Sequence, residues 1–387
     1  MSDRNQNVYL GNWREAPQNR WSLHHVRELI PTANIPNQPD QICELRRTTS
    51  DLDGLHFIDG NGNQRSLATI LTEAWTDALC VLHKGSIVYE WYAPHYSGTD
   101  PHILFSVSKS VTGALAGVLV EQGRLAVDEQ VSTYIPDAAG AAYGDCTVQH
   151  LLDMQVGLDF SEIYTGENAQ FNRYRVATGW NLSTPGESAG DLRNFLITLG
   201  HSGTPHGHTF QYMSPNTDML GLILEAASGE CLCELLSKHI WRPMGAESDA
   251  YITVDARGAP RAAGGICVLP RDLARFGQVM CGGGRFNDRQ VIPEHWVEDC
   301  RSGGSRDAWQ RGSMSDLLPN GKYRNQWYQT GNPAGAFCAI GIHGQWIYVD
   351  TAAEVVIVKV SSQPDPVDDA LDTMLLQFYG GIVNALN

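Results

Sequence analysis

The sequence predicts an α/β (α+β) fold in which an antiparallel sheet, built from both ends of the chain, is flanked by helices. Two observations indicate the sheet: residues 78–92 form two strand-like runs around a His-Lys-Gly-Ser turn, and residues 345–360 form a second such hairpin. A third observation is that the intervening stretches carry apolar residues at helical spacing. We therefore expect an α/β domain made of residues 1–105 and 255–387, with a mostly helical domain, residues 106–254, inserted into it.

The composition allows large hydrophobic cores and disfavours two classes of partner. Of the 387 residues, 42% are hydrophobic and ten are tryptophan. The formal charge of −16, with only five lysines, disfavours nucleic acid and anionic membrane surfaces as partners. The first residues lack the pattern of a signal peptide, and no stretch reads as transmembrane. We expect a cytoplasmic protein whose nine scattered cysteines are reduced and mostly buried.

The predicted elements follow in order along the chain. Residues 1–70 are polar and irregular, and no element is predicted there. A buried helix should follow the first hairpin, because residues 110–120 are apolar or small nearly all round and Gly123 is placed as a C-cap glycine. Polar start residues and helical spacing predict later helices over residues 147–154, 191–199, 217–227, 271–280 and 368–386.

Ser106 and Lys109 form the only Ser-x-x-Lys in the chain, at the start of this buried helix. Residues three apart share one face of a helix, so the hydroxyl and the amine can touch. A serine becomes a nucleophile when a base removes its proton, and a lysine of lowered pKa is such a base. The unpaired N–H groups at the helix start stabilise negative charge. The motif favours a serine hydrolase that forms an acyl-enzyme; the alternative interpretation is a serine cap on an ordinary core helix.

Two further segments can complete such a site. The segment 210–217 offers tyrosine, serine and asparagine together just before a helix. A lysine nearby can lower the pKa of the Tyr212 phenol, so this residue can act as base or acid; the alternative is a packed aromatic. For an oxyanion hole, the backbone N–H of Ser106 is one donor, and the glycine-rich edge strand predicted over residues 339–345 is expected to supply the other.

These segments, in this order, resemble the serine β-lactamase and DD-peptidase superfamily, specifically its class C-like esterase branch. Within it, the Tyr-x-Ser-x-Asn-Thr pattern at 212–217 and Ile-Gly-Ile-His-Gly-Gln at 340–345 are most similar to the 6-aminohexanoate-dimer hydrolases. The likeness covers about residues 75 to 362, and its further motifs lie at 123–136, 148–159 and 264–277. The resemblance implies a β-lactamase-like fold.

The resemblance also implies roles for individual residues. Ser106 is the expected nucleophile, with Lys109 as its base partner and Tyr212 as the proton shuttle. The backbone N–H groups of Ser106 and Ile342 are the expected oxyanion hole, and no metal or cofactor is required. The expected reaction is cleavage of a small ester or linear amide, and the resemblance suggests a homodimer while the oligomeric state stays open. The residues expected to contact the substrate are Tyr164, which closes over it in the family, Trp180, Ser214 and Tyr328.

Two departures from the family pattern bear on the substrate. Ala339 stands where β-lactamases and peptidases carry the lysine of Lys-Thr-Gly, which disfavours efficient β-lactam hydrolysis. Arg175 aligns with the aspartate that holds the free ammonium of the dimer hydrolases' substrate, and an arginine repels an ammonium. Cleavage of 6-aminohexanoate oligomers and weak β-lactamase or peptidase activity are therefore kept as alternatives.

Three other interpretations remain open. Residues 186–190 match Gly-x-Ser-x-Gly, the nucleophile elbow of α/β-hydrolases, but a loop-like stretch precedes Ser188 where that motif needs a buried strand. A non-catalytic binding protein on the same fold is a second. The third is a metal site at the histidine cluster, which lacks an acidic or cysteine partner at ligand spacing. The clustered histidines are His201, His206 and His208.

Overall fold

A seven-stranded antiparallel sheet joins the two ends of the chain. Its strand order is β11-β12-β13-β14-β15-β4-β5, so the C-terminal strand β15 pairs with the N-terminal strand β4. The computed structural model describes residues 7–48, 50, 52–60, 62–164, 168–183 and 190–387. The strands of the large sheet are β4 (Thr76–His83), β5 (Ser86–Tyr92), β11 (Lys322–Arg324), β12 (Trp327–Gln329), β13 (Phe337–Gly341), β14 (Gln345–Asp350) and β15 (Val355–Ser361). Both predicted hairpins and the predicted fold class are confirmed.

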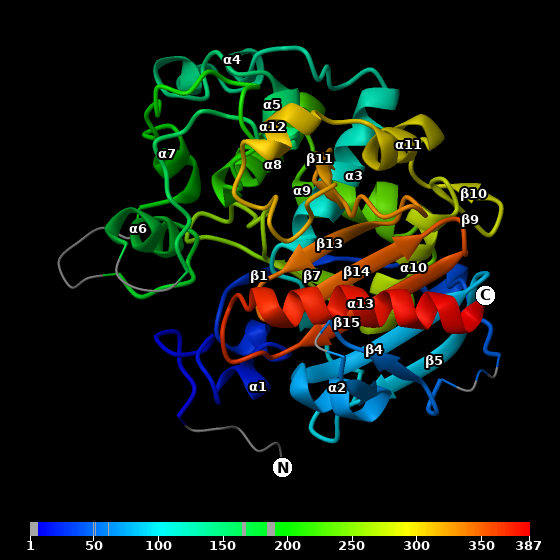
Figure 1. Ribbon diagram of the computed structural model, residues 1–387. Helices are drawn as coiled ribbons and strands as arrows, with labels where there is room; N and C mark the ends of the chain where they lie inside the picture. Colours follow the sequence, from blue (N-terminus) through cyan, green and yellow to red (C-terminus); the bar gives the residue numbers. More distant parts are fainter. Residues whose placement is uncertain (1–6, 49, 51, 61, 165–167, 184–189) are drawn as a thin grey trace.

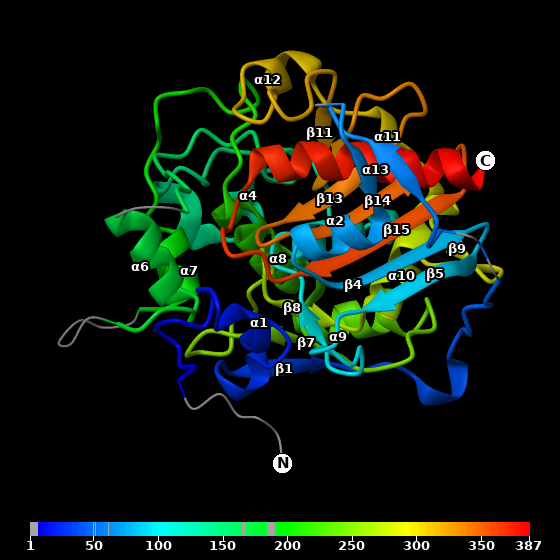
Figure 2. The same cartoon turned by 60° about the horizontal axis from the view of Figure 1, so that its bottom comes forward.

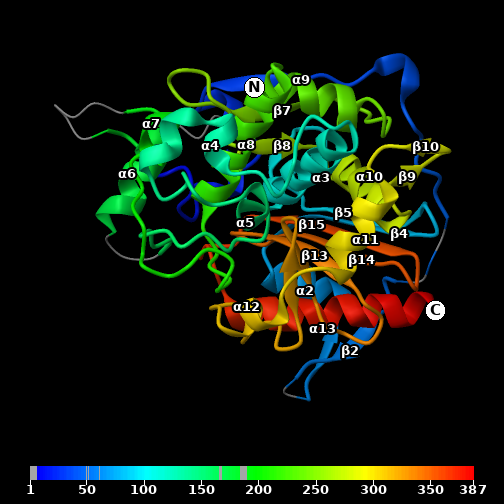
Figure 3. The ribbon, with the colours of Figure 1, turned by 90° about the horizontal axis from the view of Figure 1, so that it is seen from above.

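Helices cover both faces of this sheet. Seen from above, α3 (Val107–Glu121) and α10 (Pro270–Cys281) lie on one side of the strands, while α2 (Leu67–Glu73) and α13 (Asp369–Leu386) lie on the other (Figure 3). The long helix α13 runs across the strands in Figure 1. Every residue of β14 and β15 is buried, as expected of strands covered on both faces. The helices predicted over 271–280 and 368–386 are thereby confirmed as α10 and α13.

A group of mostly short helices lies beside the sheet, between α3 and α10 in the sequence. The predicted helices over 147–154, 191–199 and 217–227 are found, and the last of them begins three residues earlier than predicted. These helices are α4 (Val131–Tyr134), α5 (Val148–Leu152), α6 (Ala169–Ala177), α7 (Leu192–Leu196), α8 (Ser214–Ser228) and α9 (Leu232–Leu236). The packing of α8 against α3 joins this group to the sheet.

The N-terminal segment is more ordered than its sequence predicts. It contains α1 (Asn19–Ser22), β1 (Thr32–Ile35), β2 (His56–Ile58) and β3 (Gln64–Ser66). Strand β1 joins a second sheet of order β1-β7-β8-β6, and Figure 2 shows α1 and β1 beside β7 (Ala250–Thr253). Elements of three or four residues are too short to show a period, which is why periodicity missed them. The partners of β1 and β7 are β8 (Ile266–Val268) and β6 (His102–Ile103).

The remaining elements have two to nine residues each. They are η1 (Val26–Glu28), η2 (Pro39–Gln41), η3 (Pro136–Gly140), η4 (Ser237–Trp241), β9 (Arg285–Phe286), β10 (Arg289–Gln290), α11 (Glu294–Ser302) and α12 (Arg306–Gln310). All nine cysteines are free thiols, and six of them are buried. Within the described part of the chain, no helix has both the length and the apolarity to cross a membrane.

Helix α3 approaches the sheet region so closely that one of its positions requires glycine. A Cβ atom added at Gly113 would lie 2.5 Å from the backbone oxygen of Asn325. We predict that Gly113→Ala lowers the free energy of unfolding by about 1–3 kcal/mol, since overpacking outweighs the gain in helix propensity. Denaturant unfolding measures the change. Gly140→Ala is the control, because nothing lies within 4 Å of its added Cβ; equal stability of the two variants would contradict the close approach.

Candidate active site

The predicted serine and lysine touch at the first turn of α3. Ser106 is the N-cap residue of α3, and Lys109 Nζ lies 2.8 Å from Ser106 Oγ. The same amine donates a hydrogen bond to the backbone oxygen of Ala263 at 2.8 Å. Lys109 is 1% exposed, although lysine is rarely buried in proteins. The structure thus holds an amine against a hydroxyl with almost no access to water.

Burial changes the protonation of Lys109. Desolvation lowers its pKa, Glu162 raises it again in part, Arg261 lowers it, and the resulting pKa is about 7. An ordinary lysine has a pKa near 10.4 and is almost wholly protonated at neutral pH. Since a neutral amine has a free electron pair, Lys109 can accept the proton of Ser106 near neutral pH.

Two residues with unused backbone N–H groups line the pocket at Ser106. Ser106 and Ile342 both line it, and within the described part of the chain neither N–H donates a hydrogen bond to another residue. Each is next to a residue with left-handed backbone conformation: Phe105, with φ of 44°, and His343, with φ of 59°. Such conformations are costly for these residue types and concentrate at functional sites. The two donors are therefore available for an anionic oxygen.

The predicted edge strand is not at an edge. Strand β13 lies between β12 and β14, and Ile342 belongs to the turn that follows β13. Glycine is nevertheless required at Gly341, because a Cβ there would lie 2.6 Å from the backbone oxygen of Leu104. The close approach is to the protein's own chain just before Ser106. This approach places the backbone N–H groups of Ser106 and Ile342 on two neighbouring segments of the chain.

Tyr212 lies where predicted, but its acidity changes in the opposite direction. It lines a pocket together with Ser106, its ring stacks on that of Tyr328 with 6.3 Å between the ring centroids, and Lys109 Nζ lies 4.9 Å from its own ring centroid. Burial raises the pKa of Tyr212 well above its usual value, and Glu162 raises it further. The expectation of a lowered phenol pKa is therefore wrong, because desolvation outweighs the neighbouring amine. The Tyr212 phenol is therefore protonated at neutral pH, whereas a substantial share of Lys109 is neutral there.

A buried ion pair, which sequence reasoning missed, supports the lysine. Asp218 forms an ion pair with Arg261 and accepts a hydrogen bond from the Tyr174 hydroxyl. The other oxygen of Asp218 accepts the backbone N–H of Ala263 at 2.8 Å, and the carbonyl of that residue holds Lys109. The available signal was an acidic residue directly before the apolar run 219–224 of α8. Asp218 thus positions the carbonyl that orients the amine.

Glu162 is a second residue that was missed. Its carboxylate accepts the backbone N–H of Ser214 at 2.5 Å and the Ser214 hydroxyl at 2.7 Å, at the first turn of α8. It also accepts the hydroxyl of Tyr164. The positive end of a helix favours an acidic group at this place. The Ser214 hydroxyl, predicted to contact substrate, is therefore hydrogen-bonded within the protein, although Ser214 does line the pocket.

The remaining predicted substrate contacts divide between two arms of one pocket that meet at Ser106. Tyr164 lines both arms. We call the first the arginine arm, lined by Arg14, Tyr164, Phe171, Arg175, Trp180 and Ile342. We call the second the apolar arm; it is lined mostly by Tyr212, Met314, Leu317, Tyr328, Ile340 and Val367, and also by the carboxylates Asp369 and Asp372. The arginine arm has an inner part beside Ser106, of about 20 Å³, and an outer part lined also by residues 10–16, of about 280 Å³; the apolar arm encloses about 100 Å³.

Asn216 and Ser188 are not found at the pocket among the described residues. Asn216 does not line the pocket; its side chain turns into the core, where its oxygen accepts the Tyr143 hydroxyl. Ser188, the rival nucleophile, lies outside the described residues. Trp180, in contrast, is a buried wall of the arginine arm, with its ring nitrogen donating to Thr253 Oγ1 at 3.0 Å.

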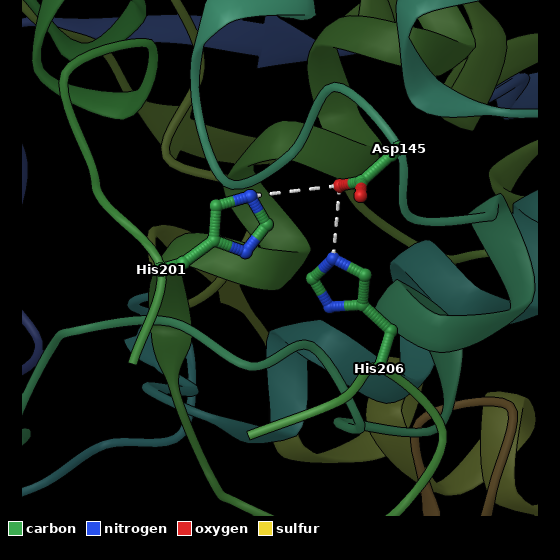
Figure 4. Close-up of side chains that lie close together, drawn as sticks. All are labelled: Asp145, His201 and His206. Atoms are coloured by element: carbon green, nitrogen blue, oxygen red, sulfur yellow. Dashed lines mark hydrogen bonds and ion pairs between the residues drawn. The ribbon is translucent and has the colours of Figure 1, made fainter. Parts of the chain in front are cut away.

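The histidine cluster acquires an acidic partner that the sequence spacing did not reveal. Asp145 Oδ1 lies 3.1 Å from His206 Nε2 and 3.6 Å from His201 Nε2 (Figure 4). The side chain of His208 is instead hydrogen-bonded to the Thr209 hydroxyl. The other ring nitrogen of His206, Nδ1, accepts the Gly157 N–H at 3.0 Å. Its Nε2 therefore carries the proton and donates to Asp145. Metal-bound histidines instead donate from their second nitrogen, so the hydrogen bonding explains this cluster without a metal.

Comparisons with known proteins cover almost the whole chain. The Beta-lactamase family model matches residues 67–380. The 6-aminohexanoate-dimer hydrolase of Paenarthrobacter ureafaciens is 38% identical over 358 residues, which are 92% of this chain and 88% of that protein.

Solved structures agree with this match. A Bacillus anthracis protein with the provisional name 6-aminohexanoate-dimer hydrolase has a TM-score of 0.90 and 29% identity, covering 99% of this chain and 98% of the other. A D-stereospecific amidohydrolase from a Streptomyces species shares the fold, with a TM-score of 0.61 and 16% identity over 80% of this chain and 98% of the other.

The pKa of about 7 at Lys109 generates a prediction for the reactivity of Ser106. The neutral amine is the minor form below this pKa and the major form above it, so the rate of Ser106 labelling by a fluorophosphonate should rise with pH and level off above about pH 8. Labelling rates measured from about pH 6 to about pH 9 test this. Asp372, in the apolar arm, also has a pKa of about 7. The inflection should therefore vanish in Lys109→Ala and persist in Asp372→Asn; the reverse result would contradict the assignment.

Proposed function

This chain belongs to the beta-lactamase family and is a serine hydrolase of that fold, and from this premise we propose that it cleaves carboxylic esters and linear amides through an acyl-enzyme on Ser106. The single observation that carries the proposal is the 2.8 Å contact between Ser106 Oγ and an amine whose pKa burial lowers to about 7. It supplies a nucleophile and its base without any rearrangement.

Acylation begins with attack by Ser106 Oγ on the substrate carbonyl while Lys109 Nζ accepts the hydroxyl proton. The carbonyl oxygen becomes an anion that accepts hydrogen bonds from the backbone N–H groups of Ser106 and Ile342. The intermediate then collapses: the bond to the leaving oxygen or nitrogen breaks, and Tyr212 donates a proton to that atom. In the proposed cycle Lys109 then returns a proton to Tyr212, its neighbour in the site, whose ring centroid lies 4.9 Å from Nζ.

Deacylation repeats the steps with water as the nucleophile. Water attacks the acyl carbonyl, its proton passes to the Lys109–Tyr212 pair, and the bond between the acyl carbon and Ser106 Oγ breaks. Ser106 recovers its proton, and the carboxylic acid is released. Atoms and charge balance with the substrate and one water molecule.

The pocket supports esters and linear amides over β-lactams. Ala339 is buried in β13 where β-lactamases and peptidases carry a lysine for the substrate carboxylate. The resemblance to a protein named as a dimer hydrolase supports linear amides as substrates. The free ammonium of a 6-aminohexanoate oligomer, however, would meet Arg175 in the arginine arm. We therefore propose weak activity on such oligomers.

Removing the nucleophile is the direct test. We predict that Ser106→Ala lowers kcat/KM for a short 4-nitrophenyl ester by at least about a thousandfold and abolishes fluorophosphonate labelling, and that Lys109→Ala comes close to this loss. Ser188→Ala is the matched control and should keep wild-type turnover. Loss of activity in the Ser188 variant alone would favour the nucleophile-elbow alternative. Wild-type protein that neither turns over nor labels would favour a binding protein.

The leaving group decides how much Tyr212 contributes. An amine leaves only after protonation, whereas 4-nitrophenolate leaves readily as an anion. Tyr212→Phe should therefore lower kcat for a linear anilide by about 100-fold, and that for the matched 4-nitrophenyl ester by about tenfold or less. Steady-state kinetics on the two substrates measure the ratio. Equal losses on both would show that the phenol does not protonate the leaving group.

A further inference from the structure

Three arginines line the arginine arm; Arg261 is paired with Asp218, and the other two come from different parts of the chain. Arg14 belongs to the N-terminal segment, and Arg175 is in the last turn of α6. Both line the inner part of the arm together with Ser106 and also its outer part. A substrate atom in this arm is therefore near two cationic side chains and the nucleophile at once.

Neither guanidinium has an acidic partner among the described residues. Arg14 donates to the backbone oxygen of Trp180 and the side-chain oxygen of Asn181, and its guanidinium carbon lies 4.9 Å from the ring centroid of Trp13. The guanidinium of Arg175 lies 4.1 Å from the ring centroid of Phe171. In the part of the chain that the structure describes, no carboxylate is within ion-pair distance of either one.

Two of the nearby acids are already engaged. Asp218 is paired with Arg261, and Glu162 accepts hydrogen bonds from Tyr164 and Ser214. Burial lowers the pKa of Arg14, and the positive charges of Arg175 and Arg261 lower it further; Glu15, an exposed acid in the outer part of the arm, raises it again in part. Such crowding of like charges is unfavourable unless an anion is bound, and guanidinium groups bind carboxylates well because their donors match the two carboxylate oxygens.

The position of Tyr212 shows which part of the substrate occupies this arm. Tyr212 lines the apolar arm, not the arginine arm. The group that protonates the leaving atom must lie beside it, so the leaving group occupies the apolar arm. The carbonyl carbon lies at Ser106, where the two arms meet, and the acyl chain extends the other way, toward Arg14 and Arg175.

We propose that Arg14 and Arg175 bind a carboxylate at the far end of the acyl chain, so that the preferred substrates are monoesters and monoamides of dicarboxylic acids. This inference rests on the proposed function. The covalent steps are unchanged: the ester or amide bond breaks, water is added, and the products are a dicarboxylic acid and an alcohol or amine. Arg175 thereby selects an anionic acyl end and excludes an ammonium.

Matched esters test the preference. We would compare 4-nitrophenyl esters of adipic acid, hexanoic acid and 6-aminohexanoic acid, whose acyl ends are anionic, neutral and cationic. The wild-type kcat/KM should be about tenfold higher for the adipate ester than for the hexanoate ester, and lowest for the aminohexanoate ester. The preference for adipate should shrink as salt is added, because the arm is partly open to solvent.

Variants assign the preference to the arm. Arg175→Gln should reduce the adipate-to-hexanoate ratio to about one, and Arg175→Asp should shift the preference to the aminohexanoate ester. Arg173→Gln is the matched control, because Arg173 is exposed on the same helix and its replacement removes the same charge. If the adipate-to-hexanoate ratio fell equally in the Arg173 and Arg175 variants, the proposal would be overturned. The preference would then come from the net positive charge of the region and not from a contact with Arg175.

Ligand binding to the inactive Ser106→Ala variant tests the same preference even if turnover of the esters is slow. Adipamate, which carries the carboxylate, should raise the melting temperature of Ser106→Ala more than hexanamide does, and the additional Arg175→Gln change should remove the difference. Equal effects of the two amides would overturn the inference about the arginine arm. The proposed function is judged separately, by whether hydrolysis of the neutral hexanoate ester depends on Ser106.

Discussion

The site depends on taking one ammonium group out of water. Lys109 is buried in the first turn of α3, and its only escape from the cost of an isolated buried charge is to lose its proton. The residues around Lys109 hold its amine in place. The cation Arg261, whose charge acts on Lys109, is neutralised by Asp218, which also holds the Ala263 peptide whose oxygen orients the amine. The same desolvation that makes the lysine a base keeps the Tyr212 phenol protonated, so one physical effect assigns opposite roles to two neighbours.

The fold contributes by bringing distant segments together at one point. Closing the sheet through β15 and β4 places the turn after β13 beside the chain that leads into α3. The absence of a side chain at Gly341 allows that turn to approach Leu104, and left-handed backbone at Phe105 and His343 fixes the peptides on either side. Phe105 and His343 are themselves buried, so their surroundings hold the strained backbone in place.

The sequence predicts the fold class, both hairpins and most long helices, because these depend on local periodicity and caps. It also predicts the contact of Ser106 and Lys109, which needs only one helical turn. It fails where the partner is remote: Glu162, Asp218 and Asp145 become informative only when folding places them beside Ser214, Ala263 and His206. The direction of the Tyr212 pKa shift was missed for a different reason, since burial is a property of the whole structure.

The N-terminal segment has a consequence for how enzymes on this scaffold diverge. Arg14 and its neighbour Trp13 precede the part of the chain that matches the family, residues 67–380, yet they pack on Trp180 and close one wall of the pocket. The arm therefore combines Arg14, outside the matched part, with Arg175, inside it, whereas Ser106 and Lys109 both lie inside. Substitutions in the N-terminal segment can thus change the shape and charge of the arm without touching the nucleophile or its base.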